Sequence, residues 1–121
     1  VMDGGAEKAL IPLAEFERFL EEEASLAEEF DLSLALIVVS REAGWNEDST
    51  RRALGILRLA DLAALLSPNH LVAFLPNTGF EGARAVERRM TDTLPDAAFG
   101  MTLRRPGEGG SEFLRRARED F

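Results

Sequence analysis

The stretch "RLADLAALLSPNHLVAFLPNT", residues 58–78, contains the clearest fold signal of the chain. Two apolar runs, 62–66 and 71–75, flank the four-residue segment SPNH at 67–70. Short apolar runs around such a segment are typical of a β-hairpin, and so short a connection requires the two strands to be antiparallel. We therefore predict a hairpin whose turn holds a proline and the only histidine of the chain.

Another apolar run, LSLALIVV at residues 32–39, predicts the centre of a sheet. Its residues are almost all apolar and several are β-branched, whereas a strand with one exposed face alternates apolar and polar residues. We therefore expect this strand to be covered on both faces.

Four helices are predicted around these strands from their apolar periodicity. They are expected at 11–30, from Asp48 or Ser49 to about Ala60, from a Thr78 cap to about Met90, and from Ser111 to the end of the chain. A further strand is expected at 97–103. This order predicts an α/β (α+β) domain with a mixed, largely antiparallel sheet flanked by helices.

The composition limits the function classes open to the chain. Its 121 residues suffice for one domain, which we place at 11–121 after a lead-in at 1–10. Cysteine is absent and histidine occurs once, which excludes disulfides and a multi-histidine metal site and agrees with a cytoplasmic location. No apolar run reaches the roughly 20 residues of a membrane span, so we expect no membrane contact by this domain.

The net charge of −8 comes from one segment. Residues 1–31 hold ten acidic and two basic residues, and the remaining residues hold twelve of each. Nucleic-acid binding needs a basic face, so we expect none here. The acidic helix at 11–30 has two open interpretations: a solvated face on a packed helix, or a functional helix that joins an upstream signalling domain, forms a dimer or contacts a partner.

The motifs of residues 58–78 resemble the middle of a GGDEF domain, the fold of bacterial diguanylate cyclases. In that family a helix ends in R-x-x-D, a strand leads to the Gly-Gly-Asp/Glu-Glu-Phe hairpin, and the next strand ends in Leu-Pro-x-Thr, as residues 75–78 do here. The stretch TLRRPGEGGSEFLRRARE, residues 102–119, also resembles the family. The resemblance covers about 11–121 and implies one domain of a longer bacterial signalling protein.

The chain departs from an active family member at several positions. The family hairpin falls on residues 67–71, where Pro68 replaces a glycine and Asn69 is neutral where the family has a metal-binding acid. The first strand ends at Ser40 without a carboxylate, and only seventeen residues separate Ser40 from Arg58, fewer than in the family. From these departures we expect a degenerate, catalytically inactive domain: not an enzyme, with no catalytic residue, metal or cofactor.

The resemblance assigns a different role to Arg58 and Asp61. They occupy the R-x-x-D inhibitory site of the family, which binds cyclic di-GMP, and the second arginine of that site falls at Arg89, with Arg88 beside it. An arginine offers a planar fork to phosphate or guanine, and an aspartate accepts hydrogen bonds from guanine. The interpretation requires Arg58 and Arg89 to face one surface, with Arg58 outside any internal salt bridge.

Two functions are compatible with these residues. In the first, cyclic di-GMP binds Arg58, Asp61, Arg89 and Arg88, and the domain is a receptor that regulates an attached domain or a protein partner. In the second, the domain is a ligand-free interaction or dimerisation module, and polar substitution of Phe16 or Phe19 on the acidic helix abolishes partner binding.

Overall fold

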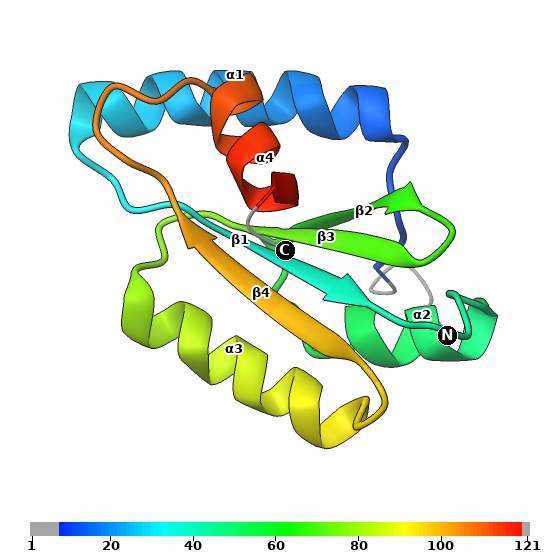
Figure 1. The fold of residues 1–121 in the computed structure, drawn as a ribbon. Coiled ribbons are helices and arrows are strands. Elements are labelled where there is room, and N and C mark those ends of the chain that lie inside the picture. The colour runs from blue at the N-terminus through cyan, green and yellow to red at the C-terminus, as the bar shows by residue number, and fades with distance from the viewer. Residues whose placement is uncertain (1–7, 120–121) are drawn as a thin grey trace, which may run out of the picture.

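Four helices and four strands follow one another along residues 8–119, which are the residues that the computed structural model describes (Figure 1). The elements are α1 (Leu13–Phe30), β1 (Ala35–Ser40), α2 (Glu47–Leu54), β2 (Leu62–Ser67), β3 (His70–Leu75), α3 (Phe80–Thr93), β4 (Ala98–Leu103) and α4 (Gly110–Glu119). Most of the predicted lead-in and the predicted end of the last helix lie outside the described residues.

The sheet has the order β2-β3-β1-β4, so β1 is an inner strand with neighbours on both sides. The predicted fold class is confirmed, and all three neighbouring pairs are antiparallel rather than mixed. Strands that a helix connects do run in the same direction, but each such pair is separated by a third strand. β3 lies between β1 and β2, and β1 lies between β3 and β4.

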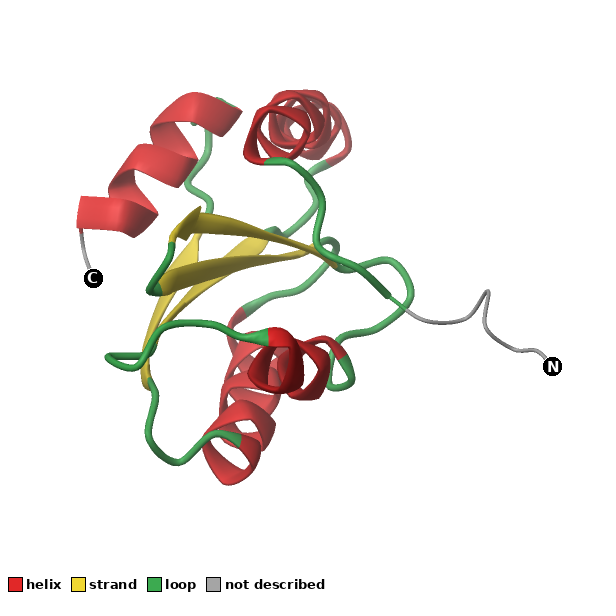
Figure 2. Cartoon of the chain, turned by 90° about the vertical axis from the view of Figure 1, so that its right-hand side faces the viewer, coloured by secondary structure: helices red, strands yellow, loops and turns green. Residues whose placement is uncertain are grey.

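The helices cover both faces of the sheet, with α1 and α4 on one face and α2 and α3 on the other (Figures 1 and 2). Successive residues of a strand point to opposite faces. In β1, Leu36 and Val38 therefore join the core under α1 and α4, whereas Ile37 and Val39 join the core under α2 and α3. This double burial explains the continuous apolar run at 32–39.

Helix α2 ends earlier than predicted. Its cap is Asn46, which exchanges two hydrogen bonds with Ser49, rather than Asp48 or Ser49. Gly55 follows its last residue, Leu54, and glycine has low helix propensity. Residues 55–61 form turns. The prediction that Arg58 and Asp61 lie on one face of a helix is therefore wrong.

Helix α1 buries one stripe of apolar residues and exposes another. Phe16, Leu20 and Ala27 are buried in the core, whereas Phe19 is 37% exposed and Phe30 is 60% exposed. Phe19 makes an edge-to-face contact with the core residue Phe74, with the two ring centroids 6.3 Å apart. A polar substitution at Phe16 would therefore destabilise the fold, so Phe16 is unsuitable for a test of partner binding.

Within residues 8–119, every helix is too short or too polar to cross a membrane.

Candidate ligand-binding site

Arg58 and Asp61 are the ends of a tight turn between α2 and β2. The Asp61 amide donates to the Arg58 carbonyl at 3.1 Å, and the Asp61 carboxylate accepts from the Arg58 amide at 2.7 Å. These reciprocal bonds satisfy backbone groups that a helix would have bonded along its axis. The R-x-x-D motif therefore closes a turn rather than forming one face of a helix.

The two side chains also bind each other. Arg58 Nη2 lies 2.9 Å from Asp61 Oδ1, and Arg58 Nε lies 3.2 Å from both carboxylate oxygens. The Asp61 side chain is fully buried, whereas the Arg58 side chain is 50% exposed. Arg58 is thus held in an internal salt bridge, contrary to the condition set from the sequence, and Asp61 is inaccessible to a ligand. A site in which both side chains contact the nucleotide does not fit this geometry, and only the exposed half of Arg58 stays open to a ligand.

Thr78 and the Pro76 carbonyl also bind the Arg58 guanidinium. Arg58 Nη2 donates to Thr78 Oγ1 at 2.6 Å and to the Pro76 carbonyl at 3.2 Å. Thr78 was expected to cap α3, but Gly79 occupies the cap position and the Thr78 hydroxyl donates to Pro76 instead. Arg58 Nη1 makes no hydrogen bond within residues 8–119, so a fixed guanidinium keeps one donor group for a ligand.

Lys8 binds the same turn, and no feature of the sequence predicted this contact. Its Nζ donates to the carbonyls of Leu59 at 3.0 Å and Asp61 at 2.6 Å. A single lysine in a lead-in carries no periodic or motif signal, so only the fold brings it to residues more than fifty positions away.

Arg88 and Arg89 lie on the exposed side of α3, and Met90 beside them is buried. Within the part of the chain that the structure describes, neither arginine side chain has a hydrogen bond or an ion pair. Successive helical residues are about 100° apart, so these two side chains leave the helix in different directions. Arg89 is nine residues beyond Phe80, or about 14 Å along the helix from the end near Arg58. A shared ligand for Arg58 and Arg89 stays a prediction.

The hairpin turn is held by its own side chains. Ser67 Oγ accepts from the His70 amide at 3.1 Å and lies 2.8 Å from His70 Nδ1. Asn69 donates its side-chain amide to the carbonyls of Arg41 at 2.8 Å and Glu42 at 3.0 Å. The turn is therefore anchored to the loop that follows β1.

The resemblance to GGDEF domains implies a divalent cation near this turn, and the residues present do not fit one. Such a cation needs anionic oxygen ligands. Asn69 presents a neutral amide whose donors already bond the β1 loop. The Arg41 side chain after β1 is only 13% exposed and pairs with Asp96 at 2.9 Å. A guanidinium at this position repels a divalent cation, and we derive no chemistry through a metal.

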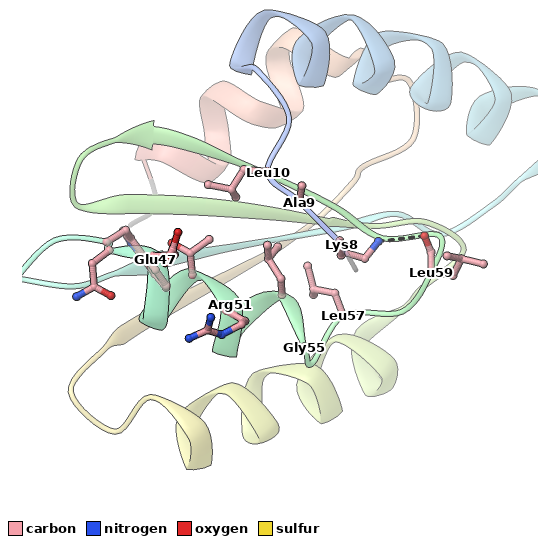
Figure 3. A pocket seen from close by; sticks show the side chains of 12 residues that line it. Lys8, Ala9, Leu10, Glu47, Arg51, Gly55, Leu57 and Leu59 are labelled. Carbon is pink, nitrogen blue, oxygen red and sulfur yellow. Dashed lines mark hydrogen bonds between the residues drawn. The ribbon is translucent and has the colours of Figure 1, made fainter. Parts of the chain in front are cut away.

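An open pocket of about 1030 Å³ lies between the lead-in and α2 (Figure 3). Leu10, Trp45 and Leu54 are among its apolar lining residues. Leu59, which is 92% exposed, borders the pocket from the Arg58–Asp61 turn. Lys8 joins the two regions, since it lines the pocket and bonds to the Leu59 carbonyl (Figure 3). The pocket therefore adjoins the Arg58–Asp61 turn at Lys8 and Leu59.

Comparison with solved structures identifies the fold as that of GGDEF domains. The GGDEF domain of DgcB from Caulobacter crescentus, solved in complex with c-di-GMP, matches with a TM-score of 0.76 and 15% identity over 98% of this chain and 90% of that one. Diguanylate cyclase SiaD from Pseudomonas aeruginosa, solved with its activator SiaC, matches with a TM-score of 0.76 and 21% identity over 95% of this chain and 56% of that one.

A third neighbour, the GGDEF domain of YfiN (TpbB) from Pseudomonas aeruginosa, has a TM-score of 0.76 and 18% identity, over 92% of this chain and 87% of that one. No family model and no curated protein matches the sequence. The chain therefore has the GGDEF fold that its motifs predicted. The prediction that it is not an enzyme is contradicted, because a structure that shares its fold is a diguanylate cyclase.

Proposed function

We propose that this GGDEF-fold domain binds cyclic di-GMP at Arg58. The observation that carries the proposal is the state of its guanidinium, which Asp61 and Thr78 hold in place while half of the side chain stays exposed. A donor group that is already oriented loses little conformational freedom on binding. Two solved structures of DgcB that share the fold are complexes with c-di-GMP, and a third neighbour is a GGDEF domain that interacts with it, which supports this choice of ligand.

In this proposal Arg58 and Asp61 have different roles. Arg58 contacts the ligand, because its outer edge can donate to a phosphate or to the O6 and N7 acceptors of guanine. Asp61 is a positioning residue that orients Arg58 and the turn. Arg88 and Arg89 are proposed to supply further positive charge to the two phosphates of the ligand.

Binding would act as a signal if the domain or its partner has two states that differ in affinity for the nucleotide. We propose that nucleotide binding regulates an attached domain or a protein partner. We also propose that the domain is cytoplasmic. The complex of SiaD with its activator SiaC supports a protein partner for this fold.

Isothermal titration calorimetry with cyclic di-GMP tests the proposal on the wild-type chain and two variants. Arg58→Ala should weaken binding by about 10- to 100-fold, the usual loss for a charge-assisted hydrogen bond. Arg115→Ala is the matched control, because Arg115 is an exposed arginine on α4, on the other face of the sheet. An absence of binding heat for the wild type at ~100 μM ligand, or equal losses in both variants, would overturn the proposal.

A further inference from the structure

The outer side of α1 carries an exposed row of large apolar residues, which we call the α1 ridge: Phe19, Leu26 and Phe30. Their exposed fractions are 37%, 43% and 60%. Spacings of seven and four residues place them along one line of a helix. The ridge extends over twelve residues, about 16 Å from Phe19 to Phe30, which is the length of three helical turns.

The glutamates on the two sides of α1 differ in whether their side chains are hydrogen-bonded. On the α4 side, Glu21 accepts from the Ser111 amide at 3.1 Å, and Glu28 accepts from Arg104 at 2.6 Å and from the Gly107 amide at 2.7 Å. The hydrogen bond from Arg104 lowers the pKa of Glu28. These acids are engaged in holding the loop before α4 and the start of α4 against α1.

The glutamates on the other flank, beside the ridge, are unengaged. Glu15, Glu22 and Glu29 are exposed and recur every seven residues, so they follow the ridge along its length. Among residues 8–119 none of the three has an ion pair or hydrogen bond from its side chain. Arg18 lies on the same flank, three residues after Glu15 and four before Glu22, so the ridge lies beside three glutamates and one arginine, with a net negative charge.

This charge decides among the occupants that the ridge could take. A second copy of α1 would bring three glutamates and only one arginine, Arg18, from each helix to the interface, and this excess of like charge disfavours association. An anionic lipid surface would be repelled in the same way. A cationic amphipathic helix satisfies both features, because it buries the ridge and pairs with the glutamates.

We propose that the α1 ridge and its line of glutamates form a docking surface for an amphipathic helix of a partner or neighbouring domain, with apolar residues on one face and lysines or arginines beside them. The helix needs at least three turns to cover the ridge. This surface is separate from Arg58 and does not depend on nucleotide binding.

Fluorescence anisotropy with a labelled 18-residue peptide tests this proposal. The peptide carries leucines at three- and four-residue spacing and lysines beside them, and a second peptide has serine in place of each leucine. At ~50 mM salt the leucine peptide should bind the wild-type chain with a Kd in the micromolar range, and the serine peptide at least ~10-fold more weakly.

Two double variants of the chain measure separately how the apolar ridge and the glutamates contribute to peptide binding. Leu26→Ser/Phe30→Ser and Glu22→Gln/Glu29→Gln should each weaken binding at least ~10-fold. Glu17→Gln/Glu112→Gln is the matched control, because it removes two exposed acids away from the ridge, and it should change the Kd less than ~2-fold. Circular dichroism melting should show that all three stay folded, since the substituted side chains are exposed.

Several results would overturn the proposal: no binding at ~200 μM peptide, equal losses in the control, or unchanged binding in the ridge variant. Sedimentation that shows a wild-type dimer lost in the ridge variant would also overturn it, because a second copy would then be the occupant.

Discussion

Two arginine–carboxylate pairs in this domain have the same chemistry and different surroundings. In the pair Arg116–Glu108, the side chains are 16% and 5% exposed, and Arg116 also donates to the Leu103 carbonyl at 2.6 Å. In the pair Arg58–Asp61, the arginine is 50% exposed and only the acid is buried. The first pair closes a loop onto a helix, whereas the second holds a cation at the surface.

In both pairs the acid stabilises the local fold. The exposure of the arginine decides whether a ligand can reach the guanidinium. Glu108 is bound from two sides, since it also accepts from the Arg105 amide at 3.0 Å. Asp61 likewise accepts from a backbone amide and from a guanidinium. Variants of the two acids should therefore affect stability, and their arginines should differ in ligand binding.

The largest effect is expected for Glu108→Ala. The substitution leaves a largely buried guanidinium without its acid, which typically costs about 3–5 kcal/mol. Urea unfolding should show this loss in the free energy of unfolding. A loss below about 1 kcal/mol would show that the pair contributes no more than an exposed salt bridge.

A smaller effect is expected for Asp61→Ala. The Arg58 amide loses its acceptor, but the half-exposed guanidinium regains water, so we expect a loss of about 1–3 kcal/mol. Affinity for cyclic di-GMP should also fall, because Arg58 is no longer fixed. Unfolding and calorimetry on one preparation would check both; unchanged affinity would contradict the positioning role of Asp61.

The smallest effect is expected for the pH dependence of the Arg116–Glu108 pair. The hydrogen bonds from Arg116 lower the pKa of Glu108, although burial acts in the opposite direction. The pair therefore stabilises the fold fully above the pKa of an unfolded glutamate, about 4.3, and the contribution is lost as the pH falls through the lower pKa of the folded state. Between about pH 5 and 2, the wild type should lose more stability than Glu108→Gln, and parallel curves would contradict this assignment.

The sequence predicted the elements whose pattern is local and missed the contacts made between distant segments. The apolar run at 32–39 and the hairpin at 62–75 are found as strands because burial on a sheet sets their composition. The early end of α2 was missed, since Arg58 and Asp61 at a spacing of three are equally compatible with a helix or a turn. Only the fold shows that Asp61 is buried.

The candidate site was predicted in its residues and not in their roles. Arg58 and Asp61 do adjoin each other, but the exchange of bonds that occupies Asp61 depends on backbone geometry after Gly55. Lys8 and Thr78 reach Arg58 and its turn from distant parts of the chain, and no spacing in the sequence indicates either contact.

Arginine Nε–Hε NMR spectra, recorded while cyclic di-GMP is added to the wild-type chain, test the central claim most directly. The signal of Arg58, assigned with Arg58→Lys, should shift in proportion to occupancy, and that of the enclosed Arg116 should stay in place. Shifts at Arg116, or an unmoved Arg58 signal at saturating nucleotide, would contradict the claim that cyclic di-GMP binds the exposed and already oriented guanidinium of Arg58.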